Sequence, residues 1–170
     1  MSDKAIPTEQ IGSIPRSAEL VEYYHKFENG EISFEQLDEI SKQEIIAVMK
    51  ALESTGSPVI SDGEQSKFNG FATYCLYGAD NITANGVEVE FSDGHSRFLP
   101  VLNSPPLRFK RSADEFLDFS LQHTDLPIKQ SVVSPSMLSL LYPSQGFTDY
   151  SRAQFVEDII EQHAGEVRRC

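Results

Sequence analysis

The chain has 170 residues and a formal net charge of -12, with 26 acidic against 14 basic side chains. Such a surface repels phosphate backbones, so nucleic acid is excluded as an expected partner. No apolar run approaches the length of a membrane span and the N-terminus lacks a signal-peptide pattern, so no membrane partner is expected. The two cysteines, Cys75 and Cys170, form neither a metal-type pair nor a disulfide framework, which favours a reducing, cytoplasmic setting.

The first part of the chain alternates between extended and helical patterns. Residues 5–14 predict a short strand that runs into a Gly-Ser turn, and residues 17–30 predict an amphipathic helix that ends at Asn29-Gly30. An apolar stripe at helical spacing then continues to Gly56, which indicates one long helix or two joined ones. Two capping-box patterns mark possible helix starts in this stretch: Ser33 with Gln36, and Ser41 with Glu44.

Two carboxylates follow the next predicted strand. Residues 57–61 form a short β-branched run, which is typical of a buried parallel strand, and Asp62-Gly63-Glu64 comes directly after it. In barrel and doubly wound α/β enzymes the chemistry lies at the carboxyl ends of the strands. Asp62 and Glu64 are therefore candidate site residues, with Gly63 supplying a sharp turn; by itself the tripeptide also fits a solvated turn.

Beyond this point the pattern changes twice. The aromatic segment 68–77 favours packing, and residues 82–103 predict a β-hairpin whose turn contains His95. A helix from Ser112 to about 122 and a strand at 127–133 come next. The last helix begins at Ser151, and its predicted packing face carries Phe155, Ile159, His163 and Val167.

This alternation predicts an α/β fold of the (β/α)8 barrel type. About four strands are present, half the number of a complete barrel, which typically has about 250 residues. Residues 1–170 are therefore interpreted as a single truncated domain, the first half of a barrel with a β-hairpin excursion. Such a half-barrel leaves sheet edges near residues 5–11 and 128–133, which predicts self-association.

Several motifs resemble one known family. Residues 11–16, Ile-Gly-Ser-Ile-Pro-Arg, resemble the Ile-Gly-Ser-Phe-Pro turn that opens the catalytic barrel of cobalamin-independent methionine synthase. Asp62-Gly63-Glu64 is similar to the His-Gly-Glu of that family and to the Asp-Gly-Glu of its shorter, single-barrel relatives. Ser96-Arg97, and the segment 127–135 with its Ser134-Pro135, resemble two later family segments.

The resemblance implies transfer of a methyl group from a methylated folate to the thiol of homocysteine. The residues implied for homocysteine are Ile11, Gly12, Ser13 and Glu64. Those implied for the methyl donor are Arg97 and Phe98, and Asp62 and Ser134 are candidates for the pocket rim. A carboxylate such as Glu64 suits the ammonium group of an amino acid, because opposite charges strengthen the hydrogen bond between them.

The family uses zinc, which holds the thiol as a reactive thiolate. Its ligands, a His-x-Cys pair, a Glu and a further Cys, lie in barrel strands that would follow Cys170. This chain is therefore expected to bind no stoichiometric zinc and to be inactive alone. The family also stacks a tryptophan against the folate, whereas this chain has no Trp and carries Leu141 or Tyr142 there, so the methyl donor stays open.

Two alternatives remain at this stage. The first is another enzyme of the wider barrel superfamily, such as a uroporphyrinogen decarboxylase-like or coenzyme M-type thiol transferase. The second belongs to a different class: a non-catalytic truncated paralogue that binds a small amino acid or a partner chain.

Overall fold

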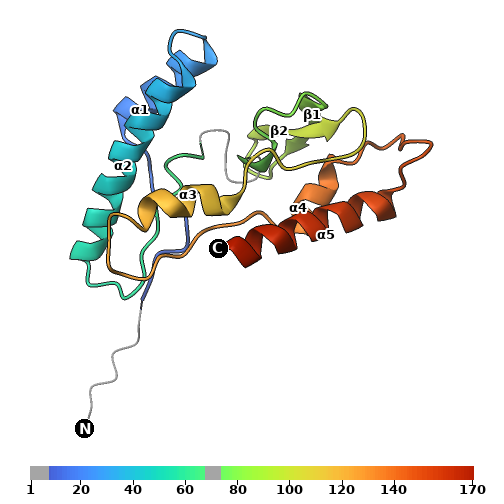
Figure 1. The fold of residues 1–170 in the computed structure, drawn as a ribbon. Helices are drawn as coiled ribbons and strands as arrows, with labels where there is room; N and C mark the ends of the chain where they lie inside the picture. The colour runs from blue at the N-terminus through green and yellow to red at the C-terminus, as the bar shows by residue number, and fades with distance from the viewer. Residues whose placement is uncertain (1–7, 68–73) are drawn as a thin grey trace. The chain divides into compact units, whose positions relative to one another are not determined.

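The computed structural model describes residues 8–67 and 74–170, which form an α/β arrangement with a small antiparallel sheet (Figure 1). The helices and strands are α1 (Ala18–Glu28), α2 (Phe34–Ser54), η1 (Tyr74–Leu76), β1 (Ile82–Glu90), β2 (Ser96–Leu102), α3 (Ala113–Ser120), α4 (Pro135–Leu138), η2 (Ser139–Leu141) and α5 (Arg152–Arg169). Two compact units contain them. Unit 1 comprises Met1–Phe71, Ala113–Ser131 and Cys170, and unit 2 comprises Ala72–Ser112 and Val132–Arg169. Among the described helices, none combines the length and apolarity that crossing a membrane requires.

Side-chain caps begin the two long helices of unit 1, and the sequence predicts the second of them, at Ser33. The Ser17 hydroxyl accepts a hydrogen bond from the Leu20 backbone N–H at 3.1 Å, which starts α1. Ser33 and Gln36 form a complete capping box at the start of α2. The two helices pack against each other (Figure 1).

Of the two alternatives for this stretch, one long helix is confirmed: α2 continues through Ser41 and Glu44, so the second capping-box pattern does not mark a helix start. The Ser41 hydroxyl donates instead to the carbonyl of Leu37, one turn earlier, at 2.9 Å. Glu44 accepts a hydrogen bond from the Ser17 hydroxyl at 2.8 Å. Both polar side chains are therefore satisfied without a break in the helix.

The predicted parallel strands of unit 1 are reduced to a single bridge. Ile60 pairs with Ile128 in the parallel sense: the Ile60 N–H donates to Pro127 O at 3.0 Å, and the Lys129 N–H donates to Ile60 O at 2.9 Å. Residues 8–14 contain no strand, although the Ile14 N–H donates to Gly63 O at 3.1 Å; residues 5–7 lie outside the described part. The parallel direction agrees with the sequence prediction, but the described residues do not show a half-barrel sheet.

Two apolar clusters stabilise unit 1. One joins α1 to α2 and contains Leu20, Tyr24 and Leu37. The other sets Ile45 and Met49 of α2 against Ile60, with partly buried apolar side chains that include Ile128. Because Ile60 is buried under α2, the residues that follow it are held in a fixed place at the end of the bridge.

The predicted hairpin of unit 2 is confirmed. Strands β1 and β2 pair antiparallel from Ile82 opposite Leu102 to Glu90 opposite Ser96, with an irregularity between Thr83 and Val87. Preceding the hairpin, η1 is buried, and the backbone carbonyl of Cys75 accepts from the Lys110 N–H at 2.8 Å.

The sequence prediction for α5 is right at its start and wrong near its end. Ser151 and Gln154 cap the helix reciprocally, with a Ser151 N–H to Gln154 Oε1 distance of 2.8 Å and a Gln154 N–H to Ser151 Oγ distance of 3.2 Å. The predicted packing residue Val167 is 50% exposed, whereas its neighbour Glu166 is fully buried. The Tyr74 hydroxyl donates to Glu166 Oε1 at 2.5 Å, and His163 Nδ1 lies 3.6 Å from Glu166 Oε2, so the buried acid has polar side chains beside both oxygens.

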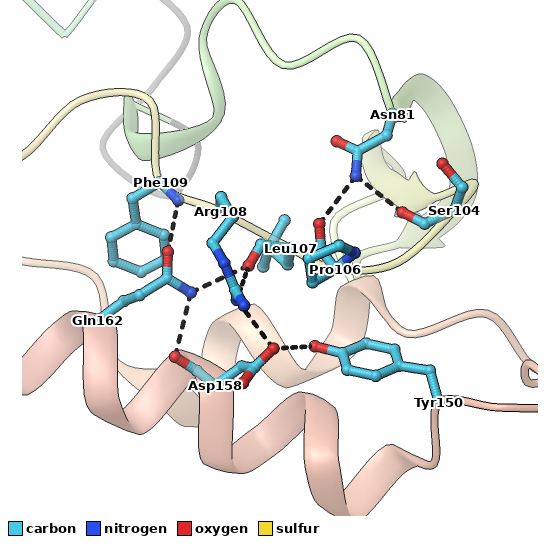
Figure 2. Close-up of polar contacts among 9 residues, drawn as sticks. All are labelled: Asn81, Ser104, Pro106, Leu107, Arg108, Phe109, Tyr150, Asp158 and Gln162. Atoms are coloured by element: carbon cyan, nitrogen blue, oxygen red, sulfur yellow. Dashed lines mark hydrogen bonds and ion pairs between the residues drawn. The ribbon is translucent and has the colours of Figure 1, made fainter.

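Polar contacts tie the irregular segment after β2 to α5 (Figure 2). Asp158 accepts from the Arg108 guanidinium at 2.9 Å and from the Tyr150 hydroxyl at 2.6 Å. Burial raises the pKa of Asp158, but these two hydrogen bonds outweigh it, so that the pKa is lowered from its ordinary value. The Gln162 amide donates to Leu107 O at 3.0 Å and accepts from the Phe109 N–H at 2.7 Å. These side-chain hydrogen bonds therefore hold residues 107–109 in place, where a regular strand would use backbone hydrogen bonds to a neighbouring strand.

Candidate functional site

The turn after Ile60 is shaped by its own side chains. The Ser61 hydroxyl accepts from the Gly63 N–H at 3.2 Å, and Asp62 Oδ1 accepts from the Glu64 N–H at 2.9 Å. Gly63 and Glu64 both have positive φ, 64° and 59°. For Glu64 this conformation is strained, because its Cβ crowds the backbone in the left-handed region. Strain of this kind persists only where surrounding contacts enforce it, and it occurs often at functional sites.

This turn aims the Glu64 carboxylate at the backbone of Gly12. A Cβ placed on Gly12 would lie 3.0 Å from Glu64 Oε1 and 3.1 Å from Ser131 Oγ. A side chain at position 12 would crowd both oxygen atoms, so the close approach favours glycine there. Glu64 is only 6% exposed, and within residues 8–67 and 74–170 no cation forms an ion pair with it. The site therefore contains a largely buried carboxylate that is able to accept a positively charged hydrogen-bond donor.

Lys67 is hydrogen-bonded to Ser131, whose hydroxyl belongs to this site. Its side chain is buried, and Nζ donates to the Ser131 carbonyl at 2.6 Å and lies 5.7 Å from the centroid of the Phe116 ring. A buried ammonium needs such partners, because desolvation would otherwise cost several kcal/mol. The contact fixes the backbone of Ser131, whose hydroxyl lies beside Gly12.

Asp62, which belongs to the same turn, is buried, with only 1% of its surface exposed. Burial is the largest influence on the pKa of Asp62 and raises it, while the Glu64 N–H and the charge of Lys67 act in the opposite direction. Within the described residues Asp62 Oδ2 has no hydrogen-bond partner, nor have the side-chain atoms of Gln10 and Gln130. Unmatched buried groups of this kind cost stability unless a water or a ligand satisfies them.

The raised pKa of Asp62 gives a prediction about stability and pH. Because the folded state binds the Asp62 proton more tightly than the unfolded state, stability is lost as the pH rises from the ordinary aspartate value of 3.8 through the folded pKa. We expect Asp62→Asn to be more stable than the wild type at pH 7, with a difference that shrinks towards pH 4. Urea unfolding of both proteins between pH 4 and 8 measures this difference.

The exposed Asp125 provides the matched control, because Asp125→Asn removes the same charge from unit 1. This control should leave the pH profile of stability unchanged. A difference between wild type and Asp62→Asn that is constant over pH would show that burial of Asp62 does not govern it.

The predicted site residues are divided between the two units. Gly12 and Glu64 are brought together in unit 1. Ile11 and Ser13 flank Gly12 in the sequence, and Ile11 is 97% exposed. Arg97 and Phe98 are exposed on β2 of unit 2. Ser134, also in unit 2, caps α4 by accepting from the Met137 N–H at 3.2 Å.

Sequence reasoning missed three residues of this site, Arg16, Lys67 and Ser131. Arg16 donates to the carbonyls of Glu64 and Lys67, and Lys67 donates to that of Ser131. These side chains serve backbone groups distant in sequence, which no local motif reveals.

The described residues do not fit the zinc that the resemblance implies. Within residues 8–67 and 74–170, no group of three or more His, Cys, Asp or Glu side chains could hold a metal ion. Structural and catalytic zinc sites have at least three protein ligands. No chemical step is therefore assigned to a metal in this chain.

Comparison with known proteins yields a likeness of fold. No family model matches the sequence, and no curated protein matches it. The chain is similar to a B12-independent methionine synthase from Shewanella sp. W3-18-1, solved in complex with selenomethionine, with a TM-score of 0.66 and 18% sequence identity. The match covers 82% of this chain and 40% of that chain, so this chain spans well under half the length of the solved protein. At this identity the comparison shows a shared fold.

Proposed function

We propose that this chain binds a sulfur-containing α-amino acid, homocysteine or methionine, through Glu64 and the turn at residues 11–13. In this proposal the Glu64 carboxylate pairs with the ammonium group of the ligand, and the backbone of Ile11, Gly12 and Ser13 contacts its amino-acid end. The single observation that carries the proposal is the largely buried Glu64 carboxylate, held beside Gly12 without a cation among the described residues.

The neighbouring structure supports the chemical class of the ligand. That methionine synthase was solved with selenomethionine, an α-amino acid. The sequence motifs at residues 11–16 and 62–64 also resemble the same family. A carboxylate in a low-dielectric site discriminates strongly in favour of a ligand that carries an ammonium group.

We further propose that the chain represents part of a methyltransferase barrel of this kind, with a methyl donor near Arg97 and Phe98. The fold likeness and the motif order support a relationship of this type. The described residues would then supply the amino-acid pocket, while the rest of the barrel and its metal would complete the reaction. A cytoplasmic setting and self-association stay predictions.

Isothermal titration calorimetry of the purified chain with L-methionine and with L-homocysteine tests the amino-acid site. We expect Glu64→Gln to weaken binding by roughly tenfold or more, about 1.4 kcal/mol, because a charge-assisted hydrogen bond becomes a neutral one. The free energy of unfolding should change by less than about 1 kcal/mol, since the neutral amide has no unpaired charge to bury. N-acetyl-L-methionine, which lacks the ammonium group, should bind the wild type as weakly as methionine binds the variant.

Glu19→Gln is the matched control, because Glu19 is exposed on α1 of the same unit and the charge change is identical. It should bind methionine as the wild type does. If the wild-type chain binds neither methionine nor homocysteine at millimolar concentration, the proposal is refuted. If it binds N-acetyl-L-methionine as tightly as methionine, Glu64 does not pair with the ammonium group.

A further inference from the structure

A single side chain, Arg16, spans the turn that carries Glu64. Its Nη2 donates to the carbonyl of Glu64 at 2.8 Å and to the carbonyl of Lys67 at 3.1 Å. The Lys67 N–H also donates to Glu64 O at 3.1 Å, so that the two ends of the turn are joined directly and through the guanidinium. Arg16 therefore contacts the backbone of the candidate ligand residue, and does not contact its carboxylate.

Tyr24 completes the contact on the other side of the guanidinium. Arg16 Nε donates to the Tyr24 hydroxyl at 3.0 Å, and the guanidinium carbon lies 5.4 Å from the centroid of the Tyr24 ring. The Tyr24 hydroxyl in turn donates to the carbonyl of Gln65, which follows Glu64 directly in the turn that Arg16 holds. Tyr24 is buried in the α1–α2 cluster, so the turn is connected through Arg16 and Tyr24 to the core of unit 1.

The segment that carries Arg16 is itself bound along its length to the turn. The Ile14 N–H donates to Gly63 O at 3.1 Å, and the Gln65 amide donates to both Ile14 O and Gly63 O at 3.0 Å. The next residue, Ser17, is bound to Glu44 of α2. Arg16 thus lies between two anchored points and cannot move away from the turn without breaking these bonds.

We propose that Arg16 is a positioning residue for the Glu64 carboxylate: it holds Glu64 at positive φ, and this conformation directs the side chain to Gly12. The inference rests on the proposed amino-acid site and adds to it a residue that acts on affinity without contacting the ligand. The planar guanidinium is required, because it reaches two carbonyls and a hydroxyl from one fixed plane, whereas a lysine ammonium offers its donors from a single atom.

The test combines ligand affinity with local backbone protection. Arg16→Lys and Tyr24→Phe are expected to weaken L-methionine binding roughly three- to tenfold. Hydrogen exchange at the amides of residues 64–67 should accelerate by a similar factor, while exchange in the middle of α2 stays unchanged. Arg152→Lys is the control, because Arg152 is an exposed arginine of unit 2, and it should change neither quantity.

A double-mutant cycle separates positioning from general stabilisation. If Arg16 acts through Glu64, adding Arg16→Lys to Glu64→Gln should cause little further loss of affinity. If the two substitutions instead lower the affinity for methionine by independent factors that multiply in the double mutant, the proposal is overturned. Unchanged hydrogen exchange at residues 64–67 in Arg16→Lys would also overturn it. If the wild-type chain binds no methionine, the proposed function fails, whereas the exchange measurement still decides whether Arg16 holds the turn.

Discussion

Gly63→Ala is expected to lower the free energy of unfolding by about 2–5 kcal/mol, because strain and overpacking act together. Gly63 has a φ of 64°, where an L-residue pays roughly 1–2 kcal/mol. A Cβ there would also lie 2.8 Å from Val48 Cγ1 and 3.1 Å from Ile14 Cβ, so these side chains would have to shift. Urea or thermal unfolding followed by circular dichroism measures the loss.

Gly56→Ala isolates the conformational part of this effect. Gly56 also has a positive φ, 75°, but a Cβ at this position would have no neighbour within 4 Å. Its loss should therefore be limited to about 1–2 kcal/mol. Equal losses at the two positions would show that contact with Val48 and Ile14 contributes nothing.

Tyr74→Phe is expected to cost about 1.5–3 kcal/mol, the range for a hydrogen bond to a charged group. The Tyr74 hydroxyl donates to the fully buried Glu166, and removing the donor weakens the solvation of a carboxylate that water does not reach. Burial and the neighbouring carboxylate both raise the pKa of Tyr74, so the phenol remains a donor throughout the neutral range.

Tyr23→Phe provides the comparison for this measurement. The Tyr23 hydroxyl makes no hydrogen bond within the described residues, so the change should be within about 0.5 kcal/mol. If the two tyrosine variants have the same free energy of unfolding, the Tyr74–Glu166 bond does not stabilise the fold.

Local patterns predicted α1, α2, α3, α5 and the hairpin, but not the short helices η1, α4 and η2. The capping boxes at Ser33 and Ser151 involve residues three apart, and their geometry forms as soon as the helix does. Ser41 shows the limit of this reasoning. Ser41 and Glu44 have the same three-residue spacing as a capping box, but α2 continues through them because its apolar face is continuous. Glu44 instead binds Ser17, which lies 27 residues earlier in the sequence.

The buried polar residues could not be predicted from local sequence. Glu166 lies within an apolar helix face because Tyr74, 92 residues earlier, supplies a donor. In the candidate site, Glu64 was predicted from its place after a buried strand and Gly12 from a resemblance, and the structure brings them together. Ser131 and Arg16 escaped prediction because their contacts are with backbone groups or a glycine, and such contacts leave no mark in side-chain periodicity.

The two cysteines differ in accessibility: Cys75 is buried in η1 of unit 2, and Cys170 is exposed. A thiol reagent should therefore modify Cys170 in the native protein, whereas the Cys75 thiol becomes reachable when unit 2 opens. The rate of the second modification, followed by mass spectrometry, is then a measure of the opening equilibrium. Cys75 thus reports the opening of unit 2 through its modification. In the variant Cys170→Ser it would be the one cysteine left in the sequence.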